Sequence, residues 1–278
     1  MITEHFTQNQ LIAMLAWQVE MGADEALLDK PLGDLQDSLL LHDKSAFSSA
    51  QSATKSSAQL DNSAPNPYQL QPPISAHLDH IDNLSDLAIA LGQFDNCPLK
   101  YTASNTCFSD GNAGARLMII GEAPGRDEDR LGVPFVGAAG QFLDLMLASI
   151  GLDRGGVYLT NFLPWRPPGN RTATIEETDM LLPFLYRHVQ LANPELVLIL
   201  GGIPAKNILE SGDSILKLRG RWQDKDFGDG VMRPTMASLH PTYLMRSPAQ
   251  KRLAFDDWCG LYHRLGQQVG NKIPPVSG

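Results

Sequence analysis

Two patterns of apolar and polar residues alternate along the chain after about residue 78. Short apolar runs, which are typical of buried strands, occur at residues 116–121, 156–163, 196–201 and 233–240. Segments with apolar residues at helical spacing lie before and between these runs, at residues 83–94, 139–151, 175–192 and 203–211. Strict alternation predicts crossover connections around a mostly parallel sheet with helices on both faces. The pattern therefore predicts an α/β domain over residues 79–265.

The first 78 residues differ from the rest in composition. Leu11, Leu15 and Val19 recur at four-residue intervals, which predicts an amphipathic helix within residues 1–30. This segment has no Lys or Arg before Lys30, so docking on the domain or on a protein partner is favoured over contact with DNA. Residues 31–78 are rich in Ser, Ala, Gln and Pro and are predicted to be a disordered linker. Residues 266–278 are predicted to form a flexible tail.

The acidic charge of the chain is concentrated in this first part. The formal net charge is −9, and residues 1–78 contribute −6 of it, from three lysines and nine acidic side chains. The remaining −3 argues against a surface that coats DNA without regard to sequence, but it permits a local basic cleft. The cysteines form no disulfide framework, no signal peptide is recognised, and no apolar segment reaches the roughly 20 residues of a membrane span. A cytoplasmic protein that does not cross a membrane is expected.

Polar side chains that could take part in binding or catalysis stand at the ends of three of the predicted strands. Glu122 lies in the turn "GEAPG" (121–125) after the first run, Asn161 ends the second, and His240 follows the last. In parallel sheets ligands bind at the carboxyl ends of the strands, so we expect these side chains to meet. The glycine cluster "GVPFVGAAG" (132–140) presents Phe135 on a loop at the same edge.

Each of these residues also has a plainer interpretation. The turn at Glu122 is also what a tight strand-to-helix connection looks like, and an isolated Phe such as Phe135 is usually part of a core. An amide at Asn161 is suited either to capping a turn or to reading a base edge, and spacing alone does not decide between them. A lone histidine such as His240 is most often structural.

Basic residues follow two of these positions. Arg166 and Arg171 flank a Pro-Pro-Gly-Asn turn that is suited to approach phosphates. Leu244, Met245 and Arg246 are expected on a loop after His240. An apolar and basic loop of this kind, ahead of the pair Lys251-Arg252, is typical of a wedge that enters a base stack.

Together these blocks resemble the uracil-DNA glycosylase superfamily, and its family 4 enzymes most closely. The resemblance covers roughly residues 94–258 and rests on four ordered motifs: "GEAPG…ED…GVPFVGAAG", "N…RPPGNR" with Glu177 downstream, "LG..A...L" (200–209) and "HP..L.R". It implies a three-layer α/β/α sandwich with a central, mostly parallel sheet. It also implies an enzyme that flips uracil out of DNA and cuts its N-glycosidic bond in base excision repair.

The resemblance implies a role for each matching residue. Phe135 would stack on the flipped base, Asn161 would read the uracil edge, and His240 would face the uracil O2. Glu122 would lie in the motif on the side of the attacking water. Glu128 occupies a place where the family excludes the thymine methyl group.

Three departures from the family pattern are visible. Family 4 enzymes typically hold a four-iron, four-sulfur cluster on four cysteines. Only Cys97 stands at a matching position, and Phe94, Trp165 and Leu181 replace the other three, so we predict that the cluster is lost. Pro164 replaces a usual lysine. Ala123 replaces the carboxylate that activates water in the best-known family of the superfamily, which leaves water activation to Glu122 or to backbone carbonyls.

The sequence thus predicts a monomeric uracil-DNA glycosylase that needs no cofactor and acts on uracil-containing DNA. One alternative is a degenerate member of the family that binds DNA or uracil without efficient turnover. Another is a hydrolase of nucleosides or phosphate esters that reuses the same edge of the sheet. Retention of Phe135, Asn161 and His240 favours the enzyme over the first alternative, and Arg246 with Lys251-Arg252 favours DNA over the second.

Overall fold

The fold is described from a computed structural model, which describes residues 78–270, with side chains through residue 266. The N-terminal helix expected within residues 1–30 and all but the last residue of the expected linker (31–78) lie outside the described residues. So does the end of the expected tail, residues 271–278.

A six-stranded sheet with the order β1-β3-β2-β4-β6-β5 forms the centre of the domain. The strands are β1 (Asp110–Gly111), β2 (Leu117–Gly121), β3 (Val157–Asn161), β4 (Leu196–Leu200), β5 (Trp222–Asp226) and β6 (Met232–Ser238). The four inner strands are parallel to one another, and β1 and β5 pair antiparallel at the two edges. The predicted α/β class with a mostly parallel sheet is therefore confirmed.

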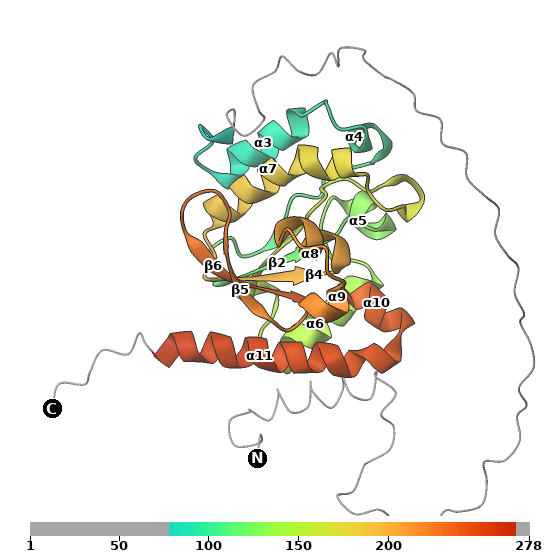
Figure 1. Cartoon of the computed structure of the whole chain (residues 1–278). Helices are drawn as coiled ribbons and strands as arrows, with labels where there is room; N and C mark the ends of the chain where they lie inside the picture. Colours follow the sequence, from blue (N-terminus) through green and yellow to red (C-terminus); the bar gives the residue numbers. More distant parts are fainter. Residues whose placement is uncertain (1–77, 271–278) are drawn as a thin grey trace, which may run out of the picture. The chain divides into compact units, whose positions relative to one another are not determined.

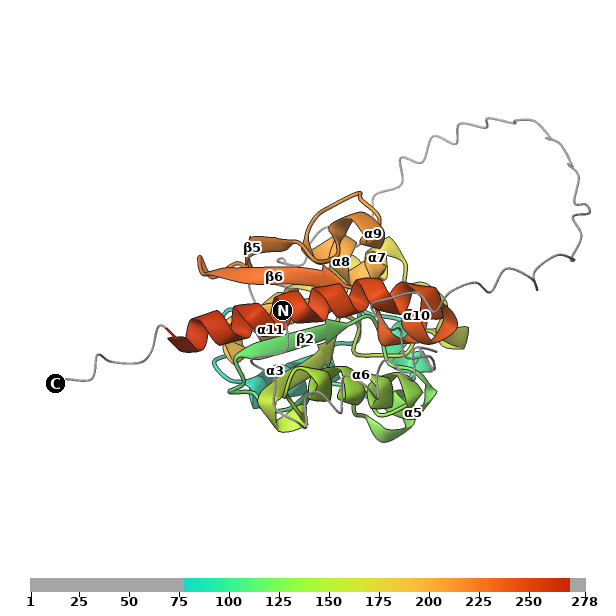
Figure 2. The ribbon, with the colours of Figure 1, turned by 90° about the horizontal axis from the view of Figure 1, so that it is seen from below.

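Helices cover both faces of this sheet. They are α3 (Leu84–Gln93), α4 (Leu99–Thr102), α5 (Arg126–Leu131), α6 (Ala138–Ser149), α7 (Ile175–Ala192), α8 (Gly202–Ile208), α9 (Ile215–Leu218), α10 (Pro241–Arg246) and α11 (Lys251–Gly270). In Figure 1, α3 and α7 lie above the sheet, and α6 and α11 lie below it. Figure 2, seen from below, shows α11 running across the sheet with α6 on one side of it. No helix among residues 78–270 is long and apolar enough to cross a membrane.

Alternate residues of the inner strands build two separate cores. In β2, Met118 and Ile120 belong to the core beneath α3 and α7, while Leu117 and Ile119 belong to the core against α6 and α11. Every residue of β2, β3 and β4 is buried. This burial on both faces explains why the strands appear in the sequence as continuous apolar runs.

Helix boundaries follow local signals in the sequence. Helix α7 begins after Thr174, whose side chain accepts from the Glu177 N–H while the Glu177 side chain accepts from the Thr174 N–H. This reciprocal pair satisfies two donors that the first turn of a helix leaves open. Helix α3 begins after Asn83, whose side chain accepts from the Asp86 N–H at 2.9 Å.

Two sequence-based expectations about the C-terminal part are wrong. Residues 244–246 were expected on a loop, but they form the end of helix α10, which His240 caps and Pro241 begins. Proline suits the first helical position because its fixed φ is helical and its missing N–H is not needed there. The tail was expected from residue 266, but α11 continues to Gly270.

Candidate active site

A pocket of about 530 Å³ opens where the inner strands end. Its lining includes residues that follow β2, end β3, follow β4 and follow β6. The chain leaves β2 for β3 on one side and later returns to β4 on the other side, so the strand order reverses at β2. Such a reversal leaves a crevice outside the carboxyl ends of the strands, which is where α/β proteins bind ligands.

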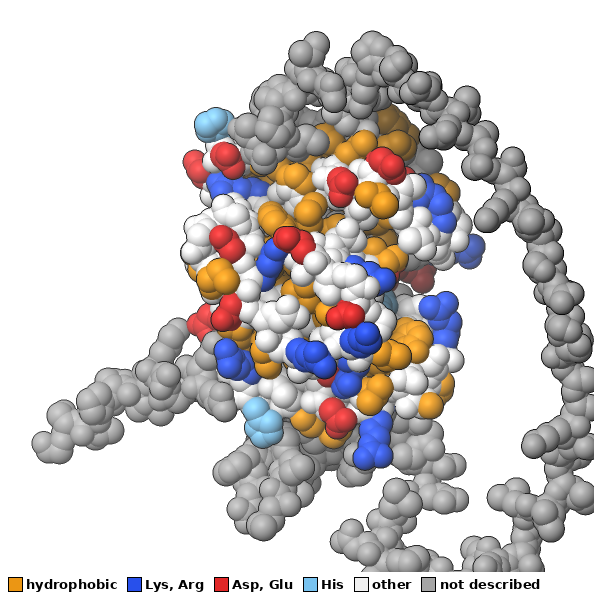
Figure 3. Space-filling view, in the orientation of Figure 1, with side chains coloured by type: hydrophobic (Ala, Val, Ile, Leu, Met, Phe, Trp, Pro, Cys, Tyr) orange, Lys and Arg blue, Asp and Glu red, His pale blue; other side chains and the backbone are white. Residues whose placement is uncertain are grey.

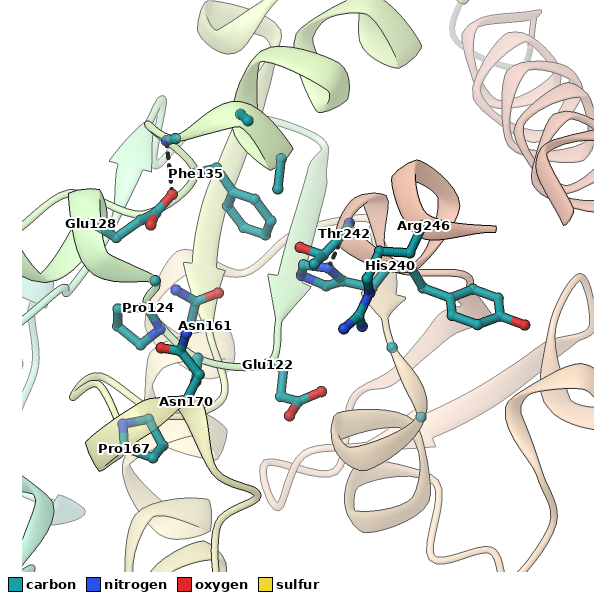
Figure 4. Close-up of a pocket in the computed structure, with 18 of the residues that line it drawn as sticks. Glu122, Pro124, Glu128, Phe135, Asn161, Pro167, Asn170, His240, Thr242 and Arg246 are labelled. Atoms are coloured by element: carbon teal, nitrogen blue, oxygen red, sulfur yellow. Dashed lines mark hydrogen bonds between the residues drawn. The ribbon is translucent and has the colours of Figure 1, made fainter. Parts of the chain in front are cut away.

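Phe135 forms one wall of this pocket. Its ring faces the cavity from the loop before α6, and the ring centroid lies 6.1 Å from that of His240, with 25° between the ring planes (Figure 4). The side chain is only 4% exposed, so Phe135 also belongs to the core against α6. Gly121 makes room for the ring, since a Cβ atom at that position would lie 2.5 Å from Phe135 Cζ. Both interpretations of Phe135, core residue and pocket wall, therefore apply.

Asn161 lies at the end of β3, directly beside Gly121 of β2 in the parallel register. Its side chain lines the pocket and is 6% exposed. Among the residues that the structure describes, no hydrogen bond of this amide is found, although buried amides are normally paired. The donor and the acceptor of Asn161 are therefore both available to a ligand in the pocket.

His240 lies opposite Phe135, at the start of α10. Its Nδ1 accepts from the Thr242 N–H at 3.2 Å, which leaves the proton of the neutral ring on Nε2. Burial, together with the nearby positive charge of Arg246, lowers the pKa of His240 to about 4. At neutral pH the ring is therefore an uncharged donor through Nε2.

Three acids line the pocket: Glu122, Glu128 and Asp127, of which Asp127 is exposed and lies 3.8 Å from Arg130. Glu122 has no hydrogen-bond partner for its carboxylate within residues 78–266, and burial raises its pKa. The carboxylate of Glu128, in contrast, accepts the Gly137 N–H at 2.8 Å, and this side chain is 8% exposed (Figure 4). Of the two less exposed acids, Glu122 has free oxygens in the cavity, whereas Glu128 fixes the loop that leads into α6.

The predicted basic residues are arranged unequally around the pocket. Arg246 lines it and forms no ion pair with the described residues, whereas Arg171 lines it with its guanidinium held by Glu177 at 2.6 and 2.8 Å. Arg166 lies outside the lining and donates to Asn170 Oδ1 at 2.8 Å. In Figure 3, lysine and arginine side chains gather around α9 on the face shown.

The wedge predicted from residues 244–246 does not form as expected. Leu244 is fully buried in the core against α6 and α11, because helix α10 turns it inward. Met245 is 45% exposed but is not part of the pocket lining. Lys251 is 6% exposed, and its Nζ lies 5.1 Å from the centroid of the Phe142 ring, so it does not present a charge to solvent as predicted.

The sequence did not single out several lining residues. Asn170 reaches the pocket from the Pro-Pro-Gly-Asn turn, where its φ of 56° is left-handed. Thr242 and Tyr243 line it from α10. Asparagine in such a turn is a recognisable signal, since this residue type tolerates left-handed backbone. The two α10 positions gave no signal because that helix was not predicted.

Cys97 is buried in the core beneath α3 and α7, to which the residues at the other three expected cluster-ligand positions also belong. Trp165 and Leu181 are buried in this core, and Phe94 packs against it. The Phe94 ring lies 5.1 Å from that of Phe184. Within the described part of the chain, no group of three or more His, Cys, Asp or Glu side chains is arranged to hold a metal ion. This set of side chains does not fit a cluster that needs four thiolates.

Comparison with known proteins gives the same family as the motifs. Residues 108–259 match the profile of the uracil DNA glycosylase superfamily. A type-4 uracil-DNA glycosylase of Archaeoglobus fulgidus is 35% identical over 201 residues, which cover 70% of this chain and 98% of that protein. The type-4 enzyme of Pyrobaculum aerophilum is 38% identical over 166 residues, 56% of this chain and 81% of that protein. That of Thermotoga maritima is 36% identical over 164 residues, 58% of this chain and 83% of that protein.

Proposed function

This chain belongs to the uracil DNA glycosylase superfamily, and on that premise we propose that it is a uracil-DNA glycosylase. The reaction hydrolyses the bond between uracil N1 and the deoxyribose C1′, and it leaves an abasic site in the DNA. One observation carries the proposal: Glu122, Asn161 and His240 converge on a single pocket beside an aromatic wall, and their ligand-facing atoms have no partner among the described residues.

The base enters the pocket after it leaves the helical stack. Extrusion of the base costs a few kcal/mol. Stacking and hydrogen bonds inside a pocket contribute a favourable free energy of about the same order. The ring of Phe135 provides the stacking surface. The Asn161 amide offers an N–H donor and a carbonyl acceptor together, which matches the O4 acceptor and N3–H donor along one edge of uracil.

His240 stabilises the leaving group. Breaking the bond places negative charge on the uracil ring, and a donor already in place at O2 lowers the barrier without reorganisation. A neutral ring with its proton on Nε2 is such a donor, and the Thr242 N–H fixes this tautomer by donating to Nδ1. Arg246 adds positive charge near the same side of the pocket.

Glu122 acts on the sugar side. Positive charge develops on the deoxyribose as the bond breaks, and a carboxylate nearby stabilises it and accepts a proton from the attacking water. Ala123, the next residue, has no carboxylate, so Glu122 is the acid we assign to this step. Its free oxygens support that assignment, because a carboxylate already paired with an arginine would be a poor base.

The direct test uses oligonucleotides that carry one uracil, single-stranded and paired with G or A. The expected result is an alkali-sensitive abasic site with the wild-type protein and a large loss of rate with His240→Ala or Asn161→Ala. No cleavage by the wild type would contradict the proposal. A protein that binds the uracil-bearing strand tightly but does not cut it would establish the alternative, a degenerate binding protein.

We also propose that the protein works without an iron–sulfur cluster. The residues at the four expected ligand positions support this: Cys97 shares a core with Phe94, Trp165 and Leu181, so the set supplies one thiolate where four are needed. Purified protein should contain no stoichiometric iron, and Cys97→Ala should retain activity. A coloured protein with about four irons per chain would contradict the proposal.

The setting that we propose is a cytoplasmic monomer engaged in base excision repair, with residues 8–29 docking on the domain or on a protein partner. A mass of one chain, measured by light scattering, would agree with the proposed monomer. A mass of two chains would overturn it.

A further inference from the structure

The backbone at Phe135 has an unusual conformation for a residue of this type. Its φ is 56°, in the left-handed region that bulky residues seldom adopt. Its peptide also packs directly on Gly140, where a Cβ atom would lie 1.7 Å from the Phe135 carbonyl oxygen. A conformation of this kind persists only where the surrounding structure holds it.

The side chain of Arg154 holds this peptide in place. Its Nη2 donates to the Phe135 carbonyl oxygen. The other nitrogens of the guanidinium bind two carboxylates: Nε donates to Asp144 at 2.8 Å and Nη1 to Asp110 at 2.6 Å. All three nitrogens are therefore engaged, and the two acids orient the fork toward the carbonyl.

The three partners of Arg154 come from different elements. Asp110 is in β1 at the edge of the sheet, Asp144 is in α6, and Phe135 is in the loop before α6. Arg154 itself lies just before β3 and does not line the pocket. The guanidinium thus ties the edge of the sheet and one helix to the wall of the pocket, and it acts without touching a ligand.

We infer that Arg154 is a positioning residue for uracil recognition. By holding the Phe135 peptide, it keeps the aromatic ring in place for stacking on the extruded base. This inference rests on the proposed function, and it adds to it a residue that no sequence motif singled out. The neutral alternative is that Arg154 only stabilises the fold.

A double-mutant cycle separates these two roles. The variants are Arg154→Gln, Phe135→Ala and the double variant. The readouts are the dissociation constant of free uracil, from ligand-observed NMR, and that of DNA with an abasic site, which lacks the base. If Arg154 acts through the ring, R154Q weakens uracil binding by about tenfold, within the range for one lost base–aromatic stack. The same change in the F135A background has no further effect.

Two further measurements control for loss of stability. R154Q should leave the affinity for abasic DNA within about twofold, because that ligand does not use the stack. Arg154→Lys keeps the charge but cannot bind all three acceptors, so it should recover only part of the uracil affinity. Arg116→Gln is the matched control. Arg116 precedes β2, is about as exposed as Arg154, and pairs with Glu195 at 2.6 Å. Its replacement should leave uracil binding unchanged.

The outcomes distinguish this inference from the proposed function. Equal effects of R154Q in the wild-type and F135A backgrounds would overturn the positioning role, even in an active glycosylase. The positioning role would also be overturned if R154Q weakened the binding of abasic DNA as much as the binding of uracil. If R154Q does not fold, R154K and Asp144→Asn provide the same cycle. A protein that binds uracil with this coupling but never cuts DNA would refute the proposed function alone, and one that binds no uracil would refute both.

Discussion

At the scale of single residues, burial sets the charge of the groups that would take part in the reaction. It lowers the pKa of His240 to about 4 and raises the pKa of Glu122. In both cases the uncharged form is favoured, because transfer from water penalises a charge of either sign. For His240 this is useful, since a neutral ring still donates through Nε2. For Glu122 it is a cost, since the base must be ionised.

The raised pKa of Glu122 predicts a limb in the pH profile. A carboxyl whose pKa lies above its ordinary value becomes ionised only at higher pH, so kcat should rise with pH through that pKa and then level off. Glu122→Gln should lower kcat strongly and remove this limb. Single-turnover rates between pH 4.5 and 8 would measure it, with Glu176→Gln, an exposed acid at the start of α7, as the control. A limb that persists unchanged in E122Q would assign the titration to another group.

The side chains of Asn161 and Phe135, which we propose recognise uracil, both pack against Gly121. A Cβ atom there would lie 2.3 Å from Asn161 Oδ1 and 2.5 Å from Phe135 Cζ. Gly121→Ala should therefore displace the amide and the ring, and a misplacement of about 1 Å can cost roughly 100-fold in kcat/KM.

Gly92→Ala is the matched control for Gly121→Ala. No atom lies within 4 Å of a Cβ at Gly92, which is in α3. Alanine there should stabilise the helix by roughly 0.5–1 kcal/mol, because glycine loses more backbone freedom on folding. Wild-type kcat/KM in G121A, with a folded protein by circular dichroism, would contradict the assigned positions of Asn161 and Phe135.

The pocket residues at the strand ends were predictable from the sequence, but the lining residues of α10 and the residue that supports Phe135 were not. Glu122, Asn161 and His240 were identifiable because each follows a strand that is apolar enough to recognise. Arg154 gave no signal, since its partners Asp110 and Phe135 are 44 and 19 positions away. The burial of Leu244 was missed for a related reason: the side that a helix turns inward is unknown when the helix itself is not predicted.

At the scale of elements, the strands that were predicted are the buried, apolar ones, and an edge strand was missed. Strands β2, β3, β4 and β6 were predicted from their apolar runs, and helix α7 has the predicted bounds. Strand β5 reads "WQDKD" and lies at an edge with none of its residues fully buried, so its composition resembles a loop. Edge strands need fewer apolar residues, because only one of their sides is paired and neighbouring elements cover them less.

The packing of α7 on β3 predicts a pH-dependent stability. His188 of α7 is 4% exposed, lies within 2.9 Å of the Tyr158 hydroxyl and stacks on Phe108. Burial lowers its pKa from 6.5 to about 3. Between these values the unfolded chain binds a proton that the folded protein does not, so this contribution to stability is complete above pH 6.5 and is lost as the pH falls toward 3.

Replacing His188 should make stability less sensitive to acid. One such group contributes a slope of at most about 1.4 kcal/mol per pH unit, and His188→Gln removes it, while His240 continues to contribute in the same direction. Urea unfolding at pH 7 and pH 5 would measure the change. The exposed His80→Gln is the control. An equal pH dependence in the wild type and H188Q would show that His188 is protonated in the folded state.

At the scale of the whole molecule, an acidic protein must bind an acidic polymer. The net charge of −9 repels DNA at long range, yet most of it belongs to residues 1–78. Arg246 lines the pocket without an ion pair to the described residues, and Arg166 lies nearby. Local positive charge of this kind is consistent with a protein that engages a short stretch of DNA around one base, since few phosphates need to be neutralised.

This arrangement predicts a shallow salt dependence. Glu177 already neutralises Arg171. If Arg166 and Arg246 each neutralise one phosphate, the slope of log K against log salt concentration should be about −1.8, because each contact contributes about −0.9 on duplex DNA. Arg246→Gln should reduce the slope to about −0.9. Fluorescence anisotropy with a uracil-bearing duplex between 50 and about 300 mM salt would measure both.

Arg116→Gln separates local charge from total charge in this experiment. It lowers the net charge by one unit, as R246Q does, but at the opposite end of β2 from the pocket. If affinity depends on phosphate contacts, R116Q keeps the wild-type slope while R246Q loses one contact. Equal changes in the two variants would mean that DNA responds to the overall field of the protein, and Arg246 would then have no assigned phosphate. The binding energy for DNA would in that case have to come mainly from the extruded base and its pocket.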